Sequence, residues 1–249
     1  YYTFRKKEWE LPHLEYQELT VDDPNLLKLR EGSDEAGYRV MVDKSEEEIV
    51  RKLEELKTLI NDRKLEQWSF RGLKAMAFGQ HLYQPVLFLD EKFIEISPVP
   101  LNEGEWRFVE DLKSFHQHQK AALGGKELYL LRNLSKGRGV GFFEAGNFHP
   151  DFILWLVEGP RQRVLFVDPK GIRHLGLGDP KLRFHETVKE IEARLSDTSV
   201  SLDSYILSQT PSHEMQLMWS IAKPAMRARH ILFPDEDRAT YLIDLLGLS

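Results

Sequence analysis

The stretch from Gly141 to Gly171 constrains the fold of this chain more than any other, because its two apolar runs carry acids where a buried strand disfavours them. The first run extends from Phe148 to Val157 and contains Asp151, and the second extends from Val164 to Val167 and leads into Asp168. Burying an ionised carboxylate is costly unless something compensates its charge. The pattern therefore predicts neighbouring strands that bring two acids to a common point.

Lys170 follows Asp168 by two residues, so both side chains should leave an extended strand on the same face. A divalent cation held between Asp151 and Asp168 would compensate both carboxylates, and oxygen ligands suit Mg²⁺ or Mn²⁺. Such an ion can polarise a phosphoryl oxygen and lower the pKa of a water, while the lysine orients the water or offsets charge on the phosphate. The three residues therefore predict phosphodiester hydrolysis, with Asp151, Asp168 and Lys170 as catalytic residues.

Pro150 and Asp151, followed by Asp168, Pro169 and Lys170, resemble the PD-(D/E)XK nuclease signature. The surrounding sequence, FHPDFILWL and RVLFVDPKGI, is similar to the C-terminal endonuclease domain attached to superfamily 2 helicases, as in the Res subunit of type III restriction enzymes. The apolar strands before both acids add to the resemblance. It implies a metal-dependent deoxyribonuclease that acts on DNA and belongs to a larger helicase or restriction-type defence protein.

The resemblance also implies an α/β, restriction-endonuclease-like core in the order helix, three strands, helix and strand. In that core, Asp151 and Asp168 would bind Mg²⁺ or Mn²⁺, and the backbone carbonyl of Pro169 would add a ligand. Two features depart from the common pattern: the acid before the lysine is Asp rather than Glu, which shortens it by one methylene, and Pro169 fixes φ at the strand end.

An acid from the first helix is implied as well. Glu105 matches it by order and face, and would bind the metal or a water, with Glu103 and Glu110 as alternatives. Glu105 is also explained by a simpler role, an acid near a helix N-terminus that interacts with the macrodipole.

Hydrophobic periodicity predicts elements in the same order. They are a helix over 105–117 with Phe108, Leu112 and Phe115 on its buried face, strands over 127–131, 140–152 and 163–168, a helix opened by Asp179 and Pro180, and a strand over 200–207. We assign residues 101–249 to the nuclease domain.

Residues 1–100 are expected to form an accessory or connector region, because Pro98 and Pro100 mark the best boundary in the chain. Within it, Ser45 and Glu48 read as a capping box that starts an amphipathic helix. Residues 85–96 read as a β-hairpin that turns at Asp90 and Glu91.

Composition limits the classes of protein. Hydrophobic residues make up 41% and charged residues 30%, which is typical of a soluble globular chain, and the longest apolar run is too short to cross a membrane. The absence of cysteine fits a cytoplasmic location. No Walker A loop is present and the chain starts at Tyr1, so we expect a piece of a longer protein whose ATPase motor lies elsewhere. Whether the chain forms a homo-oligomer stays open.

The net charge of −6 argues against binding DNA through overall charge, so basic residues close to the acids would have to supply it. The candidates are Lys136, Arg138, Arg161, Arg163, Lys170, Arg173, Lys181 and Arg183.

Two rival functions stay open. The first is a catalytically inactive nuclease-like module that binds DNA or docks a partner of a helicase. The second is a glycoside hydrolase that pairs Asp151 with Glu144 or Glu105 as acid and base, which would need no metal and leaves Lys170 unexplained.

Overall fold

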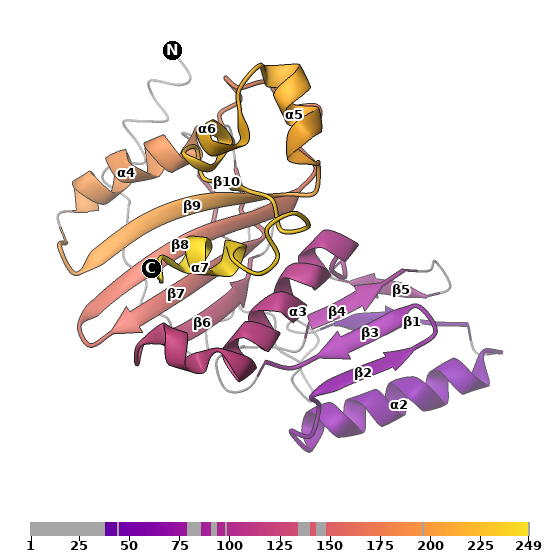
Figure 1. Cartoon of the computed structure of the whole chain (residues 1–249). Helices are drawn as coiled ribbons and strands as arrows, with labels where there is room; N and C mark the ends of the chain where they lie inside the picture. Colours follow the sequence, from indigo (N-terminus) through magenta and orange to yellow (C-terminus); the bar gives the residue numbers. More distant parts are fainter. Residues whose placement is uncertain are drawn as a thin grey trace, which may run out of the picture.

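The computed structural model describes residues 38–43, 45–78, 86–90, 94–97, 99–133, 140–142, 148–195 and 197–248. This part of the chain is a mixed α/β protein with a five-stranded sheet, a three-stranded sheet and a two-stranded ribbon (Figure 1). None of its helices is long and apolar enough to cross a bilayer.

The five-stranded sheet has the order β10-β9-β8-β7-β6, so its central strand is β8. Strands β6, β7 and β8 pair antiparallel, whereas β9 runs parallel to β8 and β10 runs parallel to β9. The strands are β6 (Glu127–Arg132), β7 (Phe152–Glu158), β8 (Arg161–Lys170), β9 (Val200–Ser208) and β10 (Ile231–Leu232).

Helices cover both faces of this sheet (Figure 1). Helices α3 (Glu103–His118) and α7 (Tyr241–Leu246) pack on one face and α4 (Phe184–Leu195) on the other, while α5 (Ser212–Trp219) and α6 (Lys223–Arg227) share a core with the β10 edge. The order α3, β6, β7, β8, α4, β9 is the order expected from the sequence.

The middle of strand β8, from Val164 to Val167, is continuously apolar because both faces of the strand are covered there. Leu165 and Val167 pack with α3, whereas Val164 and Phe166 pack with α4. Since side chains alternate along a strand, Asp168 falls on the α4 face of the sheet.

Helix α3 lies between the two sheets (Figure 1). The predicted inward residues Phe108, Leu112 and Phe115 are buried, and so is Trp106, whose ring centroid lies 5.8 Å from that of Phe88 in the smaller sheet. One helix therefore contributes to the packing of both sheets.

The smaller sheet consists of β2 (Gln67–Phe70), β3 (Leu73–Met76) and β4 (Val86–Leu89), with α2 (Glu47–Asn61) on its outer side. The ribbon pairs β1 (Arg39–Met41) with β5 (Glu95–Ser97), and a short 3-10 helix, η3 (Lys120–Leu123), follows α3. The boundary at residue 100 stays a prediction, and the core around α3 includes Met76, Phe78 and Phe88 from before it.

Two local predictions were wrong. Strands β4 and β5 do not form a hairpin, because β4 pairs with β3 and β5 pairs with β1. Helix α2 begins without a side-chain cap, because Ser45 Oγ instead donates to Asp43 Oδ1 at 2.7 Å.

Two predicted boundaries also moved. Strand β7 begins at Phe152, directly after Asp151, which fits Pro150 having no N–H to donate to a ladder. Helix α4 begins at Phe184 rather than after Asp179, whose side chain accepts a hydrogen bond from the Lys181 N–H at 2.9 Å in the preceding turn.

Candidate active site

Asp151 and Asp168 meet at the ends of two adjacent strands. The last paired step of β7 and β8 joins Phe152 to Val167, so the two acids occupy the next opposite positions. Directly opposite residues of an antiparallel pair have Cβ atoms about 4.5–5.5 Å apart. Asp151 shares a hydrogen bond with Asp168, so the structure brings together the two acids that the sequence singles out.

Burial raises the pKa of Asp151 to about 9, and the negative charges of Asp168 and Glu105 act in the same direction. The ammonium group of Lys170 lowers the pKa of Asp151, but the other effects outweigh it. Without a cation, Asp151 therefore keeps its proton at neutral pH and can donate it to Asp168.

Lys170 forms an ion pair with Asp168 Oδ2. The Asp168 side chain is only 5% exposed, whereas that of Lys170 is 22% exposed, so water and a ligand can reach the lysine. Lys170 Nζ also lies 5.3 Å from the ring centroid of Phe148, at a distance typical of a cation–π contact.

Pro169 occupies a position where its missing N–H removes no bond to β7, because the β7–β8 ladder stops at Val167. The Lys170 carbonyl accepts the Gln209 N–H at 2.9 Å, on the β9 side of the strand. Main-chain groups of successive residues point to opposite neighbours, so the Pro169 carbonyl points to the β7 side, where Asp151 lies.

The Glu105 carboxylate is turned toward the helix cap. Its Oε1 accepts from Asn102 Nδ2 at 2.6 Å and its Oε2 from the Asn102 N–H at 3.1 Å, while Asn102 Oδ1 accepts from the Glu105 N–H at 3.0 Å. Burial raises the pKa of Glu105, the Asn102 N–H lowers it, and the charge of Asp168 raises it. Glu105 is thus electrostatically close to the pair but bonded to its own N-cap.

The two alternative helix acids are bonded away from the pair. Glu103 Oε1 accepts from Arg107 at 2.5 Å, and Glu110 Oε1 accepts from Gln67 at 3.4 Å. In the described part of the chain, no three His, Cys, Asp or Glu side chains gather into a group that could hold a metal ion.

The acidic pair nevertheless has the chemistry of a cation site. A half-buried acid that keeps its proton beside a second, buried acid is a place where a divalent cation can replace the proton. Mg²⁺ commonly binds through one or two carboxylates and fills its other positions with water and substrate phosphate oxygens. Asp151, Asp168 and the Pro169 carbonyl fit that donor set.

Several of the basic residues expected to approach DNA are paired with acids. Arg163 donates to Asp203 at 3.0 Å, Arg183 donates to Glu186 at 2.8 Å, and Arg173 is bonded to Glu214. Lys136 and Arg138, as well as Glu144 of the glycosidase hypothesis, lie outside the described residues.

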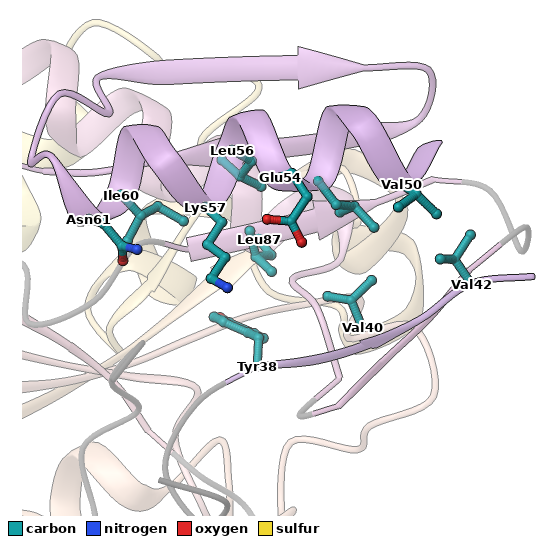
Figure 2. A pocket seen from close by; sticks show the side chains of 11 residues that line it. Tyr38, Val40, Val42, Val50, Glu54, Leu56, Lys57, Ile60, Asn61 and Leu87 are labelled. Carbon is teal, nitrogen blue, oxygen red and sulfur yellow. The ribbon is translucent and has the colours of Figure 1, made fainter. Parts of the chain in front are cut away.

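A separate pocket of about 400 Å³ lies between α2 and β1. Figure 2 shows Tyr38, Val40 and Val42 facing α2 across it, with Lys57 and Glu54 the charged side chains in its lining. It contains none of the residues of the acidic pair, so we do not assign the proposed chemistry to it.

No protein-family model, no curated protein and no solved structure matches this chain. Functional assignment therefore depends on the residues and their geometry.

Proposed function

We propose that this chain is the metal-dependent endonuclease domain of a larger helicase or restriction-type defence protein, and that it hydrolyses phosphodiester bonds of DNA. The observation that carries the proposal is the Asp151–Asp168 pair at adjoining strand ends, in which Asp151 is half-buried and Asp168 is buried, with Lys170 ion-paired to Asp168. The order of helices and strands around it supports a restriction-endonuclease-like core.

In this proposal Asp151 and Asp168 hold Mg²⁺ or Mn²⁺, and the Pro169 carbonyl assists them. The bound ion would supply positive charge at the phosphate and make a neighbouring water more acidic. The two carboxylates are held at adjoining strand ends of one sheet, which limits reorganisation when charge develops on the substrate.

Lys170 has a different task. Its partly exposed ammonium group can hydrogen-bond an attacking water or stabilise the charge that builds up on the phosphate oxygens. The contact with the Phe148 ring and the ion pair with Asp168 restrict where the ammonium group can lie.

Glu105 is proposed as an additional acid close to the ion. In this role its carboxylate would have to exchange at least one of its two hydrogen bonds to Asn102 for a bond to the ion or a water. Its part in catalysis is therefore expected to be smaller than that of Asp168.

A second candidate is a nuclease-like module that binds DNA or a partner without cleaving. It is favoured by one observation: Lys170 and Asn102 already bind the Asp168 and Glu105 carboxylates, as in a purely structural network. Under this alternative the chain binds DNA equally well with and without Mg²⁺.

Cleavage of plasmid DNA in Mg²⁺ or Mn²⁺ tests the proposal, with Asp168→Ala and Lys170→Ala as the variants. Each should lower the cleavage rate at least about 100-fold while retaining the native circular dichroism spectrum. Asp235→Ala is a suitable control, because the Asp235 side chain is 66% exposed. Cleavage at the wild-type rate by both site variants would overturn the assignment.

EDTA separates the nuclease from the glycosidase hypothesis. Loss of cleavage in EDTA and recovery with Mn²⁺ support the proposed function, whereas metal-independent hydrolysis of a glycoside would replace it.

A further inference from the structure

Asn133 lies in the same row of the sheet as the acidic pair. Arg132 pairs with Phe152, so Asn133 stands opposite Asp151 one step beyond the strand ends, just as Asp151 stands opposite Asp168. The residue is only 9% exposed, although its side chain is fully polar.

The hydrogen bonds of Asn133 use every group that its amide offers. Nδ2 donates to the carbonyls of Pro150 and Val140, at 2.8 Å each, and Oδ1 accepts from the Val140 N–H at 2.9 Å. The main-chain N–H of Asn133 donates to the Asp151 carbonyl at 2.8 Å. Asn133 therefore connects the end of β6 to the main chain of Pro150 and Asp151.

Two of these carbonyls, those of Pro150 and Asp151, belong to the peptide planes on either side of the Asp151 Cα atom. Fixing both planes fixes φ and ψ of Asp151, and these set the direction of its Cα–Cβ bond. We infer that Asn133 is a positioning residue, which aims the Asp151 carboxyl at Asp168 without touching substrate; its catalytic meaning rests on the proposed function.

No other small side chain reproduces this set of bonds. Asp at position 133 would keep the acceptor for Val140 but lose both donors, and it would add a negative charge next to Asp151. Ser could donate to only one carbonyl, and Ala to none. The three substitutions therefore remove different numbers of the hydrogen bonds that the Asn133 side chain makes.

Calorimetric titration of the whole chain with Mn²⁺ tests the inference. Groups that orient a metal ligand typically change metal affinity 10–100-fold when removed, so we expect Asn133→Ala to raise the Kd for Mn²⁺ about 10–100-fold and Asn133→Ser less. The matched control is Asp203→Asn, which alters a buried polar residue on the opposite face of the sheet and should leave the Kd within about twofold of wild type.

A second readout separates positioning from general loss of structure. Saturating Mn²⁺ should restore the cleavage rate of Asn133→Ala to within about threefold of wild type, because the ligand itself is still present, but should not rescue Asp151→Ala. An unchanged Kd in folded Asn133→Ala, or in Asn133→Ser if the alanine variant does not fold, overturns the positioning role alone. Absence of Mn²⁺ binding by the wild type would instead remove the proposed function, and this inference with it.

Discussion

Asn102 and Glu105 cap the first turn of α3 by binding each other in both directions, side chain to backbone. This capping box satisfies main-chain N–H groups that a helix start leaves unpaired. The Glu105 carboxylate therefore has a structural role, although the nuclease resemblance implies that the same carboxylate binds the metal. The two roles can be separated because they require different chemical groups.

Glu105→Gln should preserve the cap, since glutamine also accepts a hydrogen bond at this position, and the free energy of unfolding should change by less than about 0.5 kcal/mol. Asn102→Ala should lower it by about 1 kcal/mol. Urea unfolding followed by circular dichroism measures both. A larger loss for Glu105→Gln than for Asn102→Ala would contradict the capping role.

The same variant reports on the metal. Because Glu105 is bonded to Asn102, Glu105→Gln should raise the Kd for Mn²⁺ by no more than about tenfold, against at least about 100-fold for Asp168→Asn. Glu103→Gln is the control, since its carboxylate is bonded to Arg107. Equal losses for Glu105→Gln and Asp168→Asn would show that Glu105 leaves the cap to act as a full ligand.

Asp151 makes stability depend on pH. Its folded-state pKa is raised from 3.8 to about 9, so between these values the folded protein binds more protons than the unfolded chain. Its contribution is therefore fully present below about pH 4 and is lost as the pH rises toward 9. Urea unfolding of Asp151→Asn at pH 8 should show a gain of about 1–3 kcal/mol over wild type, with a smaller gain at pH 5.

Metal binding should follow the same titration. A cation that binds the Asp151 carboxylate must displace its proton, so the affinity for Mn²⁺ should rise by up to about tenfold per pH unit between pH 6 and 8. Calorimetry in two buffers of different ionisation enthalpy would detect the released proton. A pH-independent affinity would mean that Asp151 is not a ligand.

Asp203 should stabilise the fold in the opposite pH range. Burial alone would raise its pKa, but hydrogen bonds from His230 and Arg163 and the charges of His230 and Lys189 outweigh burial and hold the pKa at about 2. The stabilisation is present above about pH 4 and is lost as the pH falls toward 2. Asp203→Asn should cost about 2–3 kcal/mol at pH 7 and clearly less at pH 3, as measured by urea unfolding.

Gly104 lies under the Gln209 side chain, and a Cβ atom at position 104 would come within 1.6 Å of Gln209 Nε2. Gln209 is exposed and flexible, so it can move away at little cost, while alanine favours a helix by about 1 kcal/mol over glycine. Gly104→Ala should therefore raise the free energy of unfolding by up to about 1 kcal/mol. A lower free energy of unfolding would show that the contact between Gly104 and the Gln209 side chain stabilises the fold.

Much of the large sheet could be predicted because its signals are local. The apolar run before Asp168 and the spacing of Phe108, Leu112 and Phe115 each need only one segment of chain, and both predictions agree with the buried residues. The meeting of Asp151 and Asp168 was predictable for the same reason, since Asp151 directly precedes the apolar strand β7 and Asp168 directly follows the apolar run of β8.

The smaller sheet was not predictable in the same way. Strand β4 pairs with β3 and β5 pairs with β1, and these partners depend on contacts between distant segments rather than on the turn at Asp90. Asn133 was not predicted for a related reason. A single asparagine directly after a strand is typical of an ordinary turn residue. Its importance comes from Pro150 and Asp151, which are its neighbours only in space.

The position of α3 has a consequence for how the protein unfolds. Its Trp106 ring packs on Phe88 of the smaller sheet, and its Phe108 ring lies 5.2 Å from Phe152 of the larger one. Neither sheet can lose its structure without exposing aromatic surface of this shared helix. The two halves should therefore melt together, as a single peak in the calorimetric heat capacity.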